Sequence, residues 1–135
     1  PEKNLAGVGL AYKLTEALIA ENGNKGIIAE DWLDLVAIGT VADVVPLTGE
    51  NRSLVKAGLQ RLRQCRRQGL ISLAAVAGIN LSDLTAQNIG YVIGPRLNAA
   101  GRMESALDAY SLIMSDDLEI AGSLAQKLED QNRAR

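Results

Sequence analysis

The sequence predicts a mainly helical protein, and three observations support this. Apolar residues recur at three- and four-residue spacings in successive segments, which is the period of an amphipathic helix. The chain is 47% hydrophobic but only 3% aromatic, with no Phe, so Leu, Ile, Val and Ala must fill the core. These residues suit packed helices better than a β-sandwich, and no alternating tract is long enough for a sheet. At 135 residues the chain is the size of one ordinary domain.

The first third of the chain is expected to hold two helices. The helical pattern that begins at Asn4 ends in the Glu-Asn-Gly-Asn cluster of residues 21–24. The one candidate strand, residues 26–29, is too short to form a sheet alone. A second helix is predicted over residues 31–45, closed by Pro46, because its acidic start suits a helix N-terminus.

The middle of the chain is expected to begin with a basic helix. Residues 48–51 have the composition of a turn, and Asn51 is predicted to cap a helix that runs to about Arg67 and is ended by Gly69. A short helix over residues 71–77 then stops at Gly78.

The last third is predicted to contain three further helices. The first opens near Thr85 and breaks at Gly94-Pro95. Small residues from Asn98 then lead into a helix over residues 106–114, and Asp116 and Asp117 are expected to cap the last one.

The composition excludes several kinds of site. With no histidine, the chain cannot hold a Ser-His-Asp triad, a histidine general base or a His-ligated zinc. A single cysteine, Cys65, excludes an intrachain disulfide and suits a reducing cytoplasm. No apolar run approaches the length of a membrane span, and no leader precedes the first helix. Because the sequence opens at Pro1 and ends within a helical pattern, we expect it to be part of a longer protein.

Charge is distributed unevenly along the chain, although the net charge is only −2. Residues 52–102 carry eight basic groups and one acidic group, whereas residues 1–51 carry three basic and eight acidic groups. The overall balance argues against a generic nucleic-acid binder. The basic middle is nevertheless a local surface that an anionic partner could use.

Asp43 is the first candidate functional residue. It lies in the apolar and small-residue stretch 37–45, where a carboxylate would lose hydration unless it were paired or bound a metal. A turn or cap residue before Pro46 is an equally good interpretation. One carboxylate is not a metal site, so further ligands would have to come from outside this chain.

A second candidate is the segment of residues 94–102, Gly-Pro-Arg-Leu-Asn-Ala-Ala-Gly-Arg. Arg96 and Arg102 are forked donors that match phosphate oxygens, and the Asn98 side chain or a helix N-terminus near it adds neutral donors. If a helix begins at Asn98, then Asn98 and Arg102 share a face. The alternative is a proline-broken helix junction with solvated arginines.

The predicted basic helix is a third candidate. At 100° per residue, only Arg61 of its basic side chains points away, and five fall on one arc of the helix: Arg52, Lys56, Arg63, Arg66 and Arg67. Such a stripe suits a nucleic-acid backbone, although a solvated face explains most charged helices. No aromatic residues lie among them to read bases.

Three stretches together resemble the RecJ-type single-stranded-DNA exonucleases of the DHH phosphoesterase superfamily. Residues 4–14 resemble the helix that follows the family's Asp-His-His motif, and residues 34–47 with 50–52 resemble its fourth conserved motif. Residues 94–102 resemble the RecJ signature after the first domain.

This resemblance implies a division of the chain. Residues 1–50 would be the C-terminal part of the α/β DHH catalytic domain, and residues 51–135 a helical connecting region that carries the 94–102 motif and is truncated at its end. Asp43 would be a ligand of Mn²⁺ or Mg²⁺, and Arg96, Asn98 and Arg102 would lie near the substrate.

The implied parent protein is a cytoplasmic, metal-dependent enzyme that degrades single-stranded DNA in the 5′-to-3′ direction during repair and recombination, with no membrane partner. The isolated chain is expected to be inactive, because the Asp-rich and Asp-His-His motifs are not in it. The alternative is a non-catalytic helical interaction or scaffold module of a degenerate DHH-family protein.

Overall fold

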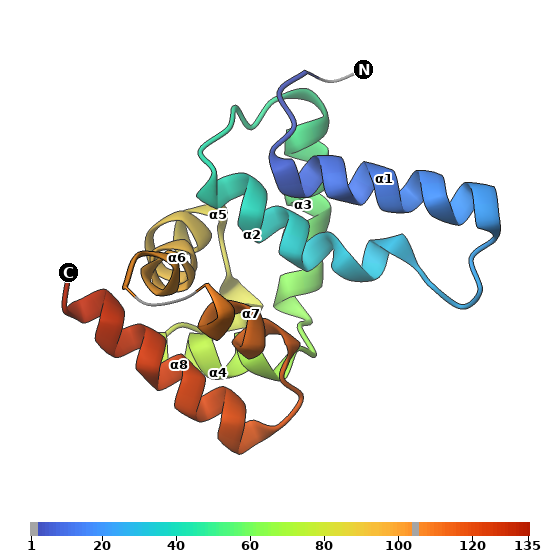
Figure 1. The fold of residues 1–135 in the computed structure, drawn as a ribbon. Helices are drawn as coiled ribbons and strands as arrows, with labels where there is room; N and C mark the ends of the chain where they lie inside the picture. Colours follow the sequence, from blue (N-terminus) through green and yellow to red (C-terminus); the bar gives the residue numbers. More distant parts are fainter. Residues whose placement is uncertain (1–2, 104–105) are drawn as a thin grey trace. The chain divides into compact units, whose positions relative to one another are not determined.

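A computed structural model describes residues 3–103 and 106–135, without the side chains of residues 102 and 103. All regular structure in these two ranges is helical (Figure 1), which confirms the predicted fold class. The chain divides into two compact units, residues 1–62 and 63–135. None of the described helices is long and apolar enough to cross a membrane.

The first unit is built on packed helices in which α1 contacts both η1 and α2 (Figure 1). Its elements are α1 (Gly7–Asn22), the 3₁₀ turn η1 (Ala29–Trp32), α2 (Leu33–Ala42) and most of α3 (Gly49–Arg63). Tyr12 from α1, Leu33 and Val36 from α2 and Leu54 from α3 form the core. Burying such side chains contributes about 1.5–3 kcal/mol each.

Two predictions for this unit need correction. Residues 26–29 are not a strand, because Gly26 has a φ of 81° and the 3₁₀ turn begins at Ala29. The helix predicted over residues 31–45 ends at Ala42. The helix cannot continue through Val44, whose φ of 56° lies outside the right-handed helical region, and Pro46 also disfavours a helical conformation at Val45.

The helix α3 differs from its prediction at both ends. It begins at Gly49, so Asn51 is not its N-cap but a fully buried residue within its first turn. It ends at Arg63, four residues before the predicted end, and Arg67 is the N-cap of the next helix. Gly69 does not end a helix either; it lies inside α4, where a Cβ would fall 1.8 Å from the carbonyl oxygen of Leu112.

The second unit is a cluster of helices in which α8 packs against α4, α6 and α7 (Figure 1). Its core side chains include Leu73, Ile89, Leu112 and Leu128. The elements in order are α4 (Gln68–Ala77), η2 (Leu81–Asp83), α5 (Ala86–Asn88), η3 (Ile89–Ile93), α6 (Gly94–Met103), α7 (Leu107–Met114) and α8 (Leu118–Arg133).

Several predicted helix boundaries in this unit are confirmed. Gly78 ends α4 with a φ of 70°. Thr85 opens the next helix with a capping box, and Asp117 caps α8 by accepting a hydrogen bond from the Ile120 amide.

The predicted break at Gly94-Pro95 is wrong. The helix passes through this point by a π-helical segment, η3, in which the Gly94 amide donates to the carbonyl of Ile89, five residues back. Pro95 lacks an amide hydrogen, and its ring would clash with the carbonyl four residues earlier in a regular α-helix. The wider π turn accommodates the ring, so the chain continues directly into α6.

Candidate functional site

Asp43 lies at the C-terminal cap of α2, where its amide donates to the carbonyl of Gly39 at 3.0 Å. The expectation that this carboxylate loses hydration is wrong, because Asp43 is exposed. The described residues hold no group of three or more His, Cys, Asp or Glu that could bind a metal ion. Divalent ions of this kind take about six ligands, so the residues described here do not by themselves fit a metal site.

The residue after Asp43 has an unusual backbone conformation. Val44 has a φ of 56°, in the left-handed region, and its side chain is 87% exposed. This conformation costs an L-amino acid about 1–2 kcal/mol, and it is least favourable for β-branched residues. The Val44 amide donates to the carbonyl of Val41 at 3.1 Å.

Asn51 fixes the loop that follows Asp43. Its side-chain amide donates to the carbonyls of Asn4, at 2.6 Å, and Pro46, at 3.0 Å. The Asn51 Oδ1 atom and the hydroxyl of Thr40 are buried without a hydrogen-bond partner. Sequence reasoning missed this role, although an Asn five residues after Pro46 in the first turn of a helix could have indicated it.

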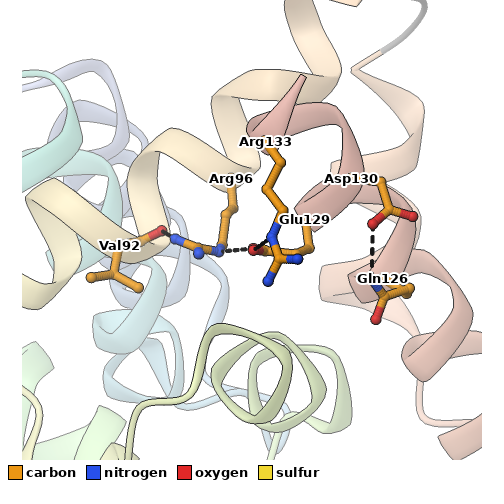
Figure 2. Close-up of polar contacts among 6 residues, drawn as sticks. All are labelled: Val92, Arg96, Gln126, Glu129, Asp130 and Arg133. Carbon is orange, nitrogen blue, oxygen red and sulfur yellow. Dashed lines mark hydrogen bonds and ion pairs between the residues drawn. The ribbon is translucent and has the colours of Figure 1, made fainter. Parts of the chain in front are cut away.

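Arg96 lies in α6 and is held by two partners inside the second unit (Figure 2). Its Nε donates to the carboxylate of Glu129 on α8, and its Nη1 donates to the carbonyl of Val92 at 2.9 Å. The Arg96 side chain is 13% exposed and that of Glu129 is 3% exposed. These two hydrogen bonds use two of the five N–H donors of Arg96, and the burial of its side chain limits the access of a phosphate to the others.

Glu129 is shared between two arginines. Its second carboxylate oxygen accepts a hydrogen bond of 2.6 Å from Nε of Arg133, one turn further along α8 (Figure 2). The hydrogen bond from Arg96, followed by that from Arg133, holds the pKa of Glu129 below its ordinary value of 4.5, although burial of the carboxylate opposes the shift. This cluster of Arg96, Glu129 and Arg133 was not predicted, because its members are separated by up to 37 positions in the chain.

Asn98 and Arg102 are the other two predicted site residues on α6. Asn98 is exposed in the middle of α6, so no helix begins at Asn98. Residues 96 and 98 are two positions apart on a helix and so point to different sides. Arg102 belongs to α6, but its side chain lies outside the described part of the chain. The structure therefore does not bring Arg96 and Asn98 together.

The predicted basic stripe is not the face of one helix. Arg52 and Lys56 are exposed on α3 at a spacing of four residues, which places them on one side of it. Arg63 donates from Nε to the carbonyl of Leu84 at 3.0 Å, and Arg67 lies beyond the end of α3.

The second unit also has an open hollow at the end of α4. It is lined by basic, polar and apolar side chains: Arg63, Gln64, Cys65, Ile71, Ala75, Gly78, Ile79, Asn80, Leu81 and Ser82. Asn80 is already engaged, since its Oδ1 accepts hydrogen bonds from the amide and hydroxyl of Ser82.

No protein-family model matches the sequence. The chain is 43% identical over all 135 residues to the single-stranded-DNA-specific exonuclease RecJ of Bacillus subtilis, of which it covers 16%. It is 40% identical over its whole length to RecJ of Escherichia coli and covers 25% of that protein.

Solved structures give the same result. RecJ of Thermus thermophilus in complex with Mn²⁺ superposes with a TM-score of 0.86 and 36% identity over 98% of this chain and 20% of that one. A structure of exonuclease RecJ bound to manganese gives a TM-score of 0.82 and 37% identity, and it covers 93% of this chain and 31% of that one. The chain is therefore homologous to a segment of the RecJ single-stranded-DNA-specific exonucleases, and it spans about a sixth to a quarter of the length of these two curated relatives.

Proposed function

We propose that the chain is part of a metal-dependent exonuclease that hydrolyses single-stranded DNA from the 5′ end in DNA repair and recombination in the cytoplasm. The observation that carries this proposal is the identity of 40–43% to RecJ exonucleases along the whole chain. Mn²⁺ and Mg²⁺ are the proposed ions, since RecJ of Thermus thermophilus has been crystallised with each of them.

The isolated chain is proposed to be inactive. Asp43 is exposed and offers one carboxylate, while a two-metal hydrolytic site needs several bridging groups. Within this proposal residues 1–50 complete the catalytic domain, residues 51–135 form the connection after it, and Asp43 supplies one ligand to a site whose other ligands lie outside the chain.

The segment of residues 94–102 is proposed to face the substrate. Among the side chains of this segment that the structure describes, that of Asn98 is exposed to solvent. Arg102 follows four positions later in α6, a spacing that places the two residues on one face of the helix. Arg96 would contact phosphate through the N–H donors that Glu129 and Val92 do not occupy. Arg52 and Lys56 on α3, with Arg63 and Arg67, are proposed as contacts to the DNA backbone without base preference.

An assay of the full-length protein tests the proposed role of Asp43. Asp43→Ala should abolish Mn²⁺-dependent release of nucleotides from single-stranded DNA and leave the melting temperature within about 2 °C, because an exposed cap residue contributes little to folding. Asp116→Ala, at another exposed aspartate, is the matched control and should keep full activity. Wild-type turnover by Asp43→Ala would instead mean that Asp43 is only a structural cap, whereas no turnover by the unmutated full-length protein would favour the scaffold alternative.

A further inference from the structure

Val44 combines two energetically unfavourable features, and no packing within its unit compensates for them. Its backbone has a φ of 56°, and the residue is 87% exposed to solvent. Glycine or asparagine would adopt this conformation more easily. A valine at this position gains almost nothing from burial within the described residues.

The other described residues with a positive φ show how unusual Val44 is. Gly23, Gly26, Gly49 and Gly78 all have positive φ, as expected where a turn needs this conformation. The remaining described case is Lys25, an exposed polar residue with a φ of 42°. Val44 is therefore the one described residue that places an exposed apolar side chain on a left-handed backbone.

The first unit itself fixes the orientation of this loop. The Val44 amide donates to Val41, and the Asn51 side chain donates to the carbonyl of Pro46 on the other side of Val44. The loop thus presents Val44 outward, with Leu47, 40% exposed, three residues further on. An exposed apolar side chain held in this way fits an apolar protein surface rather than a charged ligand.

We propose that Val44 is an anchor residue that packs against an apolar surface of the rest of the same polypeptide in the longer protein. This rests on the proposal that the chain is part of such a protein, and it is supported by length. The chain spans only 16–25% of its curated RecJ relatives, so most of a protein of that kind lies outside these residues.

Thiol labelling tests the contact without relying on nuclease activity. Val44→Cys is introduced into the full-length protein and into the 135-residue chain, and the maleimide reaction at position 44 is followed by peptide mass spectrometry. We expect labelling at least tenfold slower in the full-length protein. Lys25→Cys, also left-handed and exposed, is the control and should react equally fast in both.

Two results would overturn the proposal. Equal labelling rates at position 44 in the two proteins would mean that nothing in the longer protein covers Val44. Protection that appears in the 135-residue chain at high concentration and disappears on dilution would make the covering surface a second copy of this chain.

Substitution of Val44 by glycine gives a second, independent test. In the 135-residue chain Val44→Gly should raise the melting temperature by about 2–5 °C, because it relieves the left-handed strain and loses no packing. In the full-length protein it should lower the melting temperature, because the anchoring contact is lost, while Val44→Ile should keep the wild-type value.

The matched control is Lys25→Gly, which should raise the melting temperature in both proteins. An equal rise in both proteins on Val44→Gly would contradict the anchor, and a fall in the isolated chain would contradict the strain on which the argument rests. A failure of the proposed function would appear separately, as a full-length protein that does not degrade single-stranded DNA.

Discussion

Glu129 is a carboxylate almost wholly removed from water, and two arginines balance its charge. Arg96 is itself largely buried, whereas Arg133 is 72% exposed and retains much of its hydration. Arg96 therefore depends on Glu129 more than Arg133 does, because an arginine left buried without its carboxylate has no means of losing its charge.

Replacing Glu129 by glutamine should lower the free energy of unfolding by about 2–4 kcal/mol, because the charge of Arg96 is then left uncompensated. Asp130→Asn is the matched control: Asp130 is the next residue on α8, is exposed and accepts a hydrogen bond from Gln126 at 2.9 Å (Figure 2). It should change the free energy by no more than about 0.5 kcal/mol. Urea unfolding of the three chains measures this, and equal losses in both variants would contradict the special role of Glu129.

The lowered pKa of Glu129 predicts a dependence of stability on pH. A carboxyl group whose pKa is lower in the folded state stabilises the fold fully above its ordinary pKa of 4.5 and loses this contribution as pH falls through the lowered value. The free energy of unfolding should therefore fall below about pH 4.5, and it should fall less steeply in Glu129→Gln. Urea titrations between about pH 7 and pH 3 check this, and parallel profiles for the two proteins would show that Glu129 is not the responsible group.

Helix packing in the second unit depends on Gly69, which the sequence pattern wrongly predicts to end a helix. Gly69 lies inside α4, with the backbone of Leu112 on α7 so close that no side chain fits between them. Gly122, inside α8, has no atom within 4 Å of the position that a Cβ would take. The two glycines therefore look alike in the sequence but differ in what surrounds them.

This contrast predicts opposite effects of one substitution. Gly69→Ala should destabilise the chain by at least about 1–3 kcal/mol, because α4 and α7 must move apart. Gly122→Ala should stabilise it by up to about 1 kcal/mol, since alanine is the better residue inside a helix and meets no neighbour. Thermal melting distinguishes the signs, and a stabilising Gly69→Ala would contradict the packing described here.

Local signals predicted the elements well, whereas contacts between elements did not follow from sequence. Gly78, Thr85 and Asp117 act as helix boundaries because their conformational and capping preferences are local. Gly69 was assigned as a helix end because nothing nearby in the sequence reveals Leu112. The π segment was missed because proline was taken to end a helix, although a wider turn accommodates it.

The candidate site shows the same difference between local signals and contacts that are distant in sequence. Residues 94–102 are predicted from sequence to contain a helix break at Gly94-Pro95, whereas the chain is helical through this segment. The partner of Arg96 lies 33 residues away and could not be inferred from spacing. Asp43 was expected to be dehydrated because its sequence neighbours are apolar. It is exposed because α2 ends just before it and Val44 turns the chain outward.

At the scale of the whole molecule, the chain consists of two compact helical units joined within α3. Its functional candidates are incomplete in each of them. The first unit offers the exposed carboxylate of Asp43, and the second offers an arginine paired with Glu129 and, on another side of α6, an exposed asparagine. The proposal that the chain is a segment of a larger nuclease would account for this combination, because the groups that complete such a site would then come from elsewhere in the longer protein.

The most direct test compares the full-length protein with the 135-residue chain on single-stranded DNA labelled at its 5′ end, in the presence of Mn²⁺. The account predicts that the full-length protein releases labelled nucleotides and that the 135-residue chain, folded as judged by its helical circular dichroism, releases none above background. Release by the 135-residue chain at a rate comparable to that of the full-length protein, or no release from the 5′ end by the full-length protein, would contradict it.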